Sequence, residues 1–203
     1  MTQDHRDPRD DVPGGLAISA LGLVLDQDRG SLPFALVHGE PLVACAAWSL
    51  GAAGVLLVDA GTPWSSLVVS GDPLVLHDPL CPLTPPQFIA ECVAASADGA
   101  VVVGVRPVTD TVKVVIDGYV GATVNRDALV QVASPVVLPA AVVAEFDELP
   151  TSDLTALVAA MAPHLAVVTR EAPPSARRVG GTDDLRLLEA ATAGSRDPRP
   201  PGT

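Results

Sequence analysis

Short apolar runs alternate with helix-like stretches along most of the chain. Continuous runs of Val, Leu and Ala predict strands covered on both faces, because a sheet with one face in water would show strict alternation instead. Strands are expected at residues 16–25, 55–58, 74–76, 100–105 and 166–168, and helices at 41–50 and 85–97. This alternation predicts an α/β fold with a mostly parallel sheet and right-handed crossovers.

Residues 111–124 break this pattern, because apolar and polar positions alternate on either side of Asp117-Gly118. Asp-Gly is a strong hairpin signal, since both central positions of a type I′ turn require positive φ. We therefore expect an antiparallel arm that projects from the α/β body. A two-stranded arm has little core of its own and needs a surface to pack on, which is often a second subunit.

The two ends of the chain carry charge and proline without periodicity. Residues 1–13 and 193–203 are expected to be disordered tails, and residues 14–192 to form one domain. A length of 203 residues suits a single domain with a substantial core. The charged N-terminus lacks the apolar segment of a secretory signal, and no apolar run is long enough to span a membrane.

The composition narrows the classes of function. Asp and Glu number 24 against 12 Lys and Arg, and this excess of negative charge argues against a nucleic-acid partner. The three cysteines, Cys45, Cys81 and Cys92, show no CxxC spacing and are expected to be small buried hydrophobes in the reducing cytoplasm. No GxGxxG, P-loop or GxSxG motif is present, so neither a dinucleotide fingerprint nor a hydrolase triad can be assembled.

His77 and Asp78 close the predicted strand at 74–76, just before a proline-rich loop. In open α/β sheets ligands bind outside the carboxyl ends of the strands, so Asp78 is a candidate ligand for a divalent cation. The alternative is a structural role, in which Asp78 caps the following turn through its own backbone contacts. The position is compatible with both.

Residues 107–113 place two hydroxyls, one acid and one cation directly after another predicted strand. Thr111 and Lys113 are candidates to hold a phosphate, the first through a hydroxyl hydrogen bond and the second as a point charge. A solvated turn is the alternative interpretation. The segment alone does not decide between a phosphate site and a turn.

Three arginines are further candidates for contact with an anion. Arg126 is a solitary cation in a long acidic stretch, and such a guanidinium often has an anionic partner, although a surface ion pair with Asp127 is the alternative. Arg177 and Arg178 precede a predicted C-terminal amphipathic helix, for which Thr182 is the expected cap. Helix capping explains the acids that follow but leaves both arginines unexplained.

Several of these segments coincide with the motifs of one enzyme family. In chain order they are 75–82 (VHDAARP in the family), 107–113 (PVTDTVK, identical throughout), 122–129 (GTVDRSAL), 134–139 (TPQ.FP) and 178–185 (KITTPEDL). The chain therefore resembles the 2-C-methyl-D-erythritol 4-phosphate cytidylyltransferases and related polyol-phosphate cytidylyltransferases. The similarity runs from about residue 16 to residue 190.

This resemblance implies a Rossmann-like domain of the nucleotide-diphospho-sugar transferase type, in a homodimer whose arms reach into each other's sites. The family reaction is attack of a polyol phosphate on the α-phosphate of CTP, with Mg²⁺, releasing pyrophosphate. Asp78 would then be a catalytic residue that holds the metal, and Arg178 takes the place of a catalytic lysine. Thr111 and Arg126 would bind the polyol phosphate in the partner's site, with Lys113 beside them.

The family's glycine-rich triphosphate loop corresponds here to residues 20–36. Gly22, Arg29 and Gly30 are the residues of this loop that we expect to contact a nucleotide. Phe34 stands where the family has a phosphate-binding lysine, and the loop also contains two aspartates. The phosphate end of the nucleotide therefore meets less positive charge than in the family pattern.

Two further family segments have no evident counterpart: the base-recognising GG-x-x-R-x-x-S motif, whose place residues 61–73 occupy, and the TDD acids before the late strand. Phosphoryl transfer depends mainly on positioned positive charge. Two hypotheses therefore stand. One is a divergent nucleotidyltransferase acting on a polyol or sugar phosphate, and the alternative is a non-catalytic homologue, a dimeric scaffold for binding or regulation.

Overall fold

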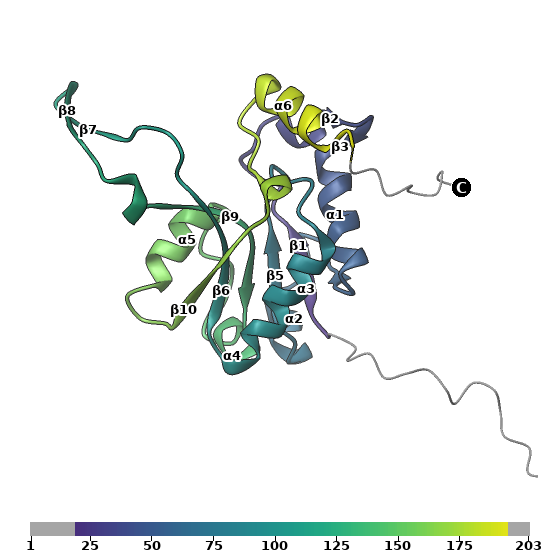
Figure 1. Ribbon diagram of the computed structural model, residues 1–203. Helices are drawn as coiled ribbons and strands as arrows, with labels where there is room; N and C mark the ends of the chain where they lie inside the picture. The colour runs from purple at the N-terminus through teal and green to yellow at the C-terminus, as the bar shows by residue number, and fades with distance from the viewer. Residues whose placement is uncertain (1–18, 195–203) are drawn as a thin grey trace, which may run out of the picture.

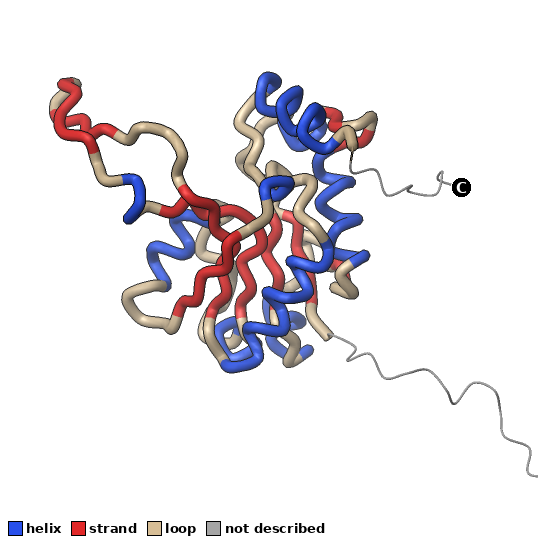
Figure 2. The backbone as a smooth tube through the Cα atoms, viewed as in Figure 1, coloured by secondary structure: helices blue, strands red, loops and turns tan. Residues whose placement is uncertain are grey.

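The computed structural model describes residues 19–194 and shows a six-stranded sheet between two layers of helices (Figures 1 and 2). The sheet has the order β10-β6-β9-β5-β1-β4. Its strands are β1 (Leu21–Val24), β4 (Leu56–Leu57), β5 (Leu74–His77), β6 (Val101–Pro107), β9 (Val130–Leu138) and β10 (Val167–Glu171). Four of these six strands, β1, β5, β6 and β10, overlap the predicted strands and differ from them only in where they begin and end. β4 lies within the predicted strand at 55–58 but is only two residues long.

Six α-helices and several short elements complete the described chain. The helices are α1 (Leu42–Ala52), α2 (Trp64–Ser70), α3 (Pro86–Ala95), α4 (Ala140–Val143), α5 (Leu154–Met161) and α6 (Thr182–Thr192). The short strands β2 (Leu36–Val37) and β3 (Glu40–Pro41) form a hairpin, and single 3-10 turns occur at η1 (Leu32–Phe34), η2 (Ser96–Asp98), η3 (Arg126–Ala128) and η4 (Pro174–Ala176).

The sheet is mostly parallel, which confirms the predicted fold class. β1 pairs in parallel with β4 and β5, and β10 pairs in parallel with β6. β9 is the exception: it lies between β5 and β6 and runs antiparallel to both. The apolar pattern did not predict β9, because Ser134-Pro135 interrupts its run of valines. Gly104 of β6 accommodates this strand, since a Cβ there would lie 2.8 Å from the Ser134 carbonyl oxygen.

Alternate residues of the central strands face two different cores, as the pleat of a strand requires. Leu74 and Leu76 of β5 pack in a cluster with buried residues of α2, α4 and α5, whereas Val75 packs in the opposite cluster with residues of α1 and α3. Val102 in β6 and Val137 in β9 also belong to the second cluster. Both faces of the sheet are therefore covered, which is why the strands are continuously apolar.

A third cluster joins the two ends of the described chain above the carboxyl edge of the sheet. Val37 and Leu42 from the N-terminal part pack with Leu80, with Val179 and with Leu188 of α6. The backbone N–H of His38 also donates to the Glu189 side chain at 2.7 Å. This packing holds the loops on which Arg29 and Arg178 lie.

The predicted arm is present as a separate two-stranded sheet, β7 (Lys113–Ile116) and β8 (Tyr119–Thr123), which extends away from the body (Figure 1). Asp117 and Gly118 have φ angles of 50° and 81° at its turn, as a type I′ hairpin requires. Every residue of β7 and β8 is exposed to solvent. The arm is therefore held to the body only at its base.

Of the remaining sequence predictions, the burial of the cysteines is confirmed and the helix cap at Thr182 is wrong. Cys45, Cys81 and Cys92 are buried, as predicted, and are not joined in disulfides. Thr182 is not the cap of α6: the helix begins at this residue, its cap position is Gly181, and no side chain caps it. The tail at 1–13 and most of that at 193–203 lie outside the described residues. Within 19–194 no helix has the length and apolar character needed to cross a membrane.

Candidate functional site

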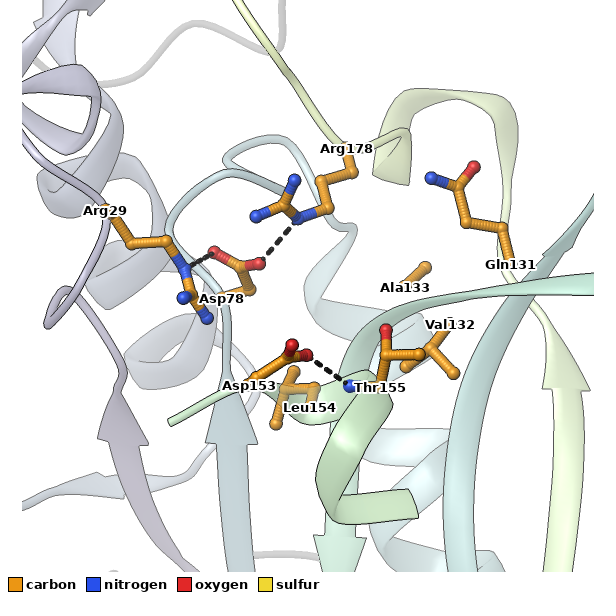
Figure 3. Close-up of a pocket in the computed structure, with 9 residues that line it drawn as sticks. All are labelled: Arg29, Asp78, Gln131, Val132, Ala133, Asp153, Leu154, Thr155 and Arg178. Atoms are coloured by element: carbon orange, nitrogen blue, oxygen red, sulfur yellow. Dashed lines mark hydrogen bonds and ion pairs between the residues drawn. The ribbon is translucent and has the colours of Figure 1, made fainter. Parts of the chain in front are cut away.

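A cavity of about 230 Å³ opens at the carboxyl end of β5, where strand and loops from distant parts of the chain meet (Figure 3). Ligands of open α/β sheets bind at this edge. The residues that line the cavity are Arg29, Asp78, Gln131, Val132, Ala133, Asp153, Leu154, Thr155 and Arg178. Three predicted site residues, Arg29, Asp78 and Arg178, are thus brought together from segments far apart in sequence.

Asp78 is at the centre of this cavity, and its side chain is only 5% exposed. Its Oδ1 accepts the backbone N–H of Leu80 at 3.0 Å and Nε of Arg29 at 3.4 Å. Its Oδ2 accepts Nε of Arg178 at 2.9 Å. The contact with Leu80 is the turn-capping role that the sequence left open, and it coexists with an ion pair to each arginine.

Arg29 enters the cavity from the loop after β1 and is held at both ends of its guanidinium group. Besides Asp78, it donates through Nη2 to the backbone carbonyl of Ser152 at 2.8 Å. Ser152 in turn donates its hydroxyl to Asp28 at 3.0 Å. Since the Arg29 side chain is only 10% exposed, it is a fixed element of the site.

Arg178 is the less confined of the two arginines, with a side chain 36% exposed. The following residue, Val179, anchors its backbone by donating N–H to the carbonyl of Leu80 at 2.7 Å. Its neighbour Arg177 does not line the cavity and pairs instead with Asp184 at 3.5 Å. The structure therefore separates two adjacent arginines that the sequence treated alike.

Asp153 is a cavity residue that the sequence analysis missed. It caps α5, its Oδ1 accepting the backbone N–H groups of Thr155 at 2.8 Å and Ala156 at 3.3 Å. The run Ser-Asp followed by Leu-Thr-Ala-Leu-Val is a helix-start signal that would have located this helix and its cap. An acid is therefore present before the late strand, where the sequence analysis found none.

The two glycines expected to contact a nucleotide are not among the residues that line the cavity. Gly22 lies inside β1, and a Cβ there would lie 2.6 Å from Cγ1 of Val55, so its smallness serves close packing. Gly30 follows Arg29 and has a φ of 58°, which favours glycine. The loop after β1 thus contributes one long cation to the cavity.

Thr111 and Arg126 line a second cavity of about 360 Å³ at the base of the arm. The Arg126 guanidinium donates through Nη1 to the backbone carbonyl of Thr109 at 2.6 Å, and it forms no ion pair with Asp127 in the described structure. Lys113 is not among the lining residues and donates to the hydroxyl of Thr123. Two of the three predicted phosphate contacts are therefore placed together.

His77 lies directly below the first cavity and is fully buried. Burial lowers the pKa of its imidazole from 6.5 to about 4, against the opposing effect of the nearby Asp78 charge. Its Nδ1 is hydrogen-bonded to the hydroxyl of Ser134, which also accepts the backbone N–H of Asp78 at 3.0 Å. His77 is thus a neutral buried group that ties β5 to β9 beneath the site.

The magnesium ion that the family resemblance implies does not fit this arrangement of side chains. Mg²⁺ requires oxygen ligands at about 2.0–2.1 Å in octahedral geometry. Asp78 already accepts three hydrogen bonds, two of them from guanidinium groups, and Asp153 caps a helix. Within residues 19–194 no group of three or more His, Cys, Asp or Glu side chains is placed to hold a metal ion.

The chain is a mostly parallel α/β domain with a cavity at the carboxyl ends of its strands. Its structure is similar to that of a 2-C-methyl-D-erythritol 4-phosphate cytidylyltransferase from Thermus thermophilus, with a TM-score of 0.65 and 21% identity over 87% of this chain and 100% of the other. It is equally similar to a 4-diphosphocytidyl-2C-methyl-D-erythritol synthase from Anaerococcus prevotii, with a TM-score of 0.65 and 15% identity over 87% and 96% of the two chains. These likenesses confirm the fold.

Sequence comparison identifies the family. The sequence model of the 2-C-methyl-D-erythritol 4-phosphate cytidylyltransferase family matches residues 65–185, and the chain belongs to that family. Asp78, Thr111, Arg126 and Arg178 lie inside the matched stretch, whereas Arg29 lies before it.

Two curated cytidylyltransferases of this name show the extent of the similarity. The one from Frankia casuarinae is 37% identical over 127 residues, which are 59% of this chain and 46% of that protein. The one from Syntrophotalea carbinolica is 46% identical over 66 residues, or 32% and 28% of the two chains. The chain thus spans less than half the length of these relatives.

Proposed function

We propose that this chain binds the phosphates of a nucleoside triphosphate, CTP by family resemblance, in the Asp78 cavity and transfers the cytidylyl group to a polyol or sugar phosphate. The observation that carries the proposal is the convergence of Arg29 and Arg178 on the Asp78 carboxylate in a cavity at the carboxyl edge of the sheet. Paired guanidinium groups in a recessed site suit phosphate oxygens, which they bind through directed, charge-assisted hydrogen bonds.

In this reaction an oxygen of the acceptor phosphate attacks the α-phosphorus of CTP, and the bond from that phosphorus to the bridging oxygen of pyrophosphate breaks. Negative charge develops on the departing pyrophosphate. Arg178, which is partly exposed, and Arg29, which is held by Ser152, are placed to stabilise that charge. Asp78 acts through them, because it sets where both guanidinium groups lie.

The acceptor phosphate is assigned to the second cavity, between Thr111 and Arg126. The threonine hydroxyl and the guanidinium group are suitable donors to a phosphate. In a homodimer the arm of one subunit brings this cavity to the Asp78 cavity of the other. Support comes from the apolar side chains that the arm exposes, Val115 at 62%, Ile116 at 65% and Val120 at 71%, since a partner surface would cover them.

A non-catalytic role is the second candidate, and one observation favours it. The position of the family's phosphate-binding lysine is occupied by Phe34, whose side chain is 62% exposed and carries no charge. Each positioned cation contributes several kcal/mol to a phosphoryl-transfer transition state. Without that cation the chain would retain a phosphate-binding cavity in a dimeric scaffold while the transfer step becomes slow. The three buried cysteines, none of them in a disulfide, support a cytoplasmic location for either role.

Two measurements on the purified protein separate these functions. Calorimetric titration with CTP, UTP, ATP and GTP reports nucleotide binding, and release of pyrophosphate from CTP in the presence of 2-C-methyl-D-erythritol 4-phosphate reports transfer. Binding of CTP together with pyrophosphate release would establish the transferase, and binding without release would establish the non-catalytic role. Absence of heat with all four nucleotides would refute nucleotide binding at this cavity.

Arg178→Gln and Arg177→Gln form a matched pair of variants for both measurements. Only Arg178 lines the cavity, and the two residues are adjacent in sequence. We expect the Arg178 variant to lose at least tenfold in CTP affinity, because a charge-assisted hydrogen bond contributes about 1.5–3 kcal/mol. The Arg177 variant should bind CTP as the unmodified protein does.

A further inference from the structure

We propose that the Asp78 cavity binds phosphate anions without a divalent cation, and that Asp78 is a positioning residue for two arginines instead of a metal ligand. The ligand class is a phosphate or pyrophosphate group, free or at the end of a nucleotide. This inference rests on the proposed phosphate-binding function and departs from the magnesium dependence that the family resemblance implies. Its basis is the hydrogen bonding and charge of the groups that line the cavity.

The hydrogen bonds of Asp78 leave little capacity for a cation. A carboxylate oxygen has about two lone-pair positions. Oδ1 already accepts from Leu80 and Arg29, and Oδ2 accepts from Arg178. One lone-pair position of Oδ2 is left for a cation, and it lies beside the Arg178 guanidinium, where like charges repel.

Arg178 is a lining residue with hydrogen-bond donors left for a ligand. A guanidinium group carries five N–H bonds in a planar fork. Arg178 uses Nε for Asp78, and its two terminal nitrogens make no hydrogen bond to another described residue. The Arg178 side chain is 36% exposed and the Asp78 side chain 5%, so the arginine presents more surface to a ligand than the acid does. An incoming anion therefore meets the arginine before it meets the acid.

The second acid of the cavity is also engaged and does not complete a metal site. Oδ1 of Asp153 accepts the N–H groups of Thr155 and Ala156, which fixes its carboxylate at the start of α5. Figure 3 shows Asp153 and Asp78 on separate elements, each directed to its own donors. Since both carboxylates already hold donors of the protein, the guanidinium groups are the cations of the cavity that can meet an anionic ligand.

Inorganic pyrophosphate is the probe for this proposal, titrated calorimetrically into the full chain in EDTA and again in excess MgCl₂. We expect binding in EDTA, with an affinity equal to or greater than that in magnesium, because magnesium then only competes for the free anion. Binding that requires magnesium would overturn the proposal. So would the absence of pyrophosphate binding under both conditions.

Manganese provides a direct test of the metal site, since its electron paramagnetic resonance signal decreases when the ion binds a protein. We expect no saturable Mn²⁺ binding below millimolar concentration in the absence of pyrophosphate, which itself chelates the ion, and the same spectra for Asp78→Asn. Tight Mn²⁺ binding that Asp78→Asn removes would identify Asp78 as a metal ligand and overturn the proposal.

Three variants assign the pyrophosphate site in EDTA. Arg178→Gln should weaken binding at least tenfold, Arg178→Lys should recover most of the loss because the charge returns, and Arg177→Gln should have no effect. Equal losses in the Arg177 and Arg178 variants would overturn the assignment, since only general surface charge would then be involved. Circular dichroism of each variant confirms that it is folded.

The two proposals fail in different ways. CTP binding that depends on magnesium would overturn the metal-independent site and leave the nucleotide-binding function intact. Pyrophosphate binding in EDTA without any binding of nucleotides would leave the metal-independent site intact and overturn the nucleotide-binding function.

Discussion

Asp78 and Arg178 lie 100 positions apart in the sequence and are joined by a hydrogen bond of 2.9 Å between Oδ2 and Nε. Asp78 directly follows the buried strand β5, and Arg178 lies in the segment just before the last helix. Their contact holds the segment before the last helix against the loop after Asp78, where the backbone N–H of Val179 also donates to the carbonyl of Leu80. Asp78 and Arg178 thus contribute both to the stability of the fold and to the charge of the site.

Removal of the Asp78 carboxylate should destabilise the protein. Asp78→Ala leaves the guanidinium of Arg29, which is 10% exposed, without its charged partner, and it removes the acceptor for the Leu80 N–H. We expect the free energy of unfolding to fall by about 2–4 kcal/mol, less than for a fully buried pair because Arg178 can turn to water. Urea denaturation measures this change.

Asp183→Ala is the matched control for Asp78→Ala. This carboxylate is 94% exposed and also pairs with an arginine, Arg186. Its removal should leave the urea midpoint almost unchanged, and a loss as large as that of Asp78→Ala would contradict the assigned role of burial.

Protonation of His77 should make stability depend on pH. The pKa of this imidazole is lowered by burial from 6.5 to about 4, so the unfolded chain takes up a proton at a higher pH than the folded chain does. Stability is therefore complete above about pH 6.5 and declines as the pH falls toward 4, by about 3 kcal/mol in total. Urea denaturation at a series of pH values measures the slope.

Two variants assign that slope to His77. His77→Gln, whatever its stability at neutral pH, should show a flatter profile between pH 6.5 and 4. His164→Gln alters an exposed histidine and should retain the original profile. If both variants keep the slope, another group titrates in this range.

Charge placed on the arm should abolish the proposed dimer. Ile116 and Val120 are 65% and 71% exposed near the turn of the arm. We expect the double change Ile116→Lys and Val120→Lys to convert a dimer into a monomer on light scattering, because a lysine is costly to bury in a subunit interface. Val69→Lys, at an 86% exposed position on α2, should leave the dimer intact.

A monomeric unmodified chain would contradict the dimer itself and the cross-subunit role assigned to Arg126. The Asp78 cavity would not be affected by that result, because all its lining residues come from one chain.

A methyl group on Gly22 should disturb the contact between β1 and the segment that follows α1. The added Cβ would lie 2.6 Å from Val55 and 3.3 Å from Leu50, both of them buried. We expect Gly22→Ala to lower the free energy of unfolding by about 1–3 kcal/mol, as overpacking in a core does. Thermal or urea denaturation measures the loss.

Gly51→Ala is its counterpart, because Gly51 lies in α1 with nothing within 4 Å of a new Cβ. Here alanine should stabilise the protein by about 0.5–1 kcal/mol through its higher helix propensity. A neutral Gly22→Ala would indicate that Val55 can move aside.

The cysteines should be unreactive in the folded protein. Burial raises the pKa of the Cys92 thiol to about 12, and burial together with the Asp78 charge raises that of Cys81 further. Since the thiolate is the reactive form, we expect negligible reaction with Ellman's reagent at pH 8 until guanidinium chloride is added, when three thiols should react. Rapid labelling of one thiol in the native state would show a local opening.

Features that depend on neighbouring residues could be predicted from the sequence. Continuous apolar runs such as that of β6 indicate strands covered on both faces, because alternate side chains of one strand meet two different layers. Asp117-Gly118 predicts the turn of the arm, because few dipeptides adopt positive φ at both positions. Residue type and position made Asp78, Arg126 and Arg178 candidates for the site, and the family motifs suggested a role for each.

Features that depend on contact between distant segments required the tertiary structure. The insertion of β9 antiparallel between two other strands is set by strand order, which no local pattern encodes. The role of Gly22 follows from the nearness of Val55.

The site itself shows the same division most clearly. Residue type marked Asp78 as a possible metal ligand, but only the folded chain brings Arg29 and Arg178 to its two oxygens. A carboxylate attracts metal ions and guanidinium groups alike. Which of them it contacts depends on the loops that packing places beside it.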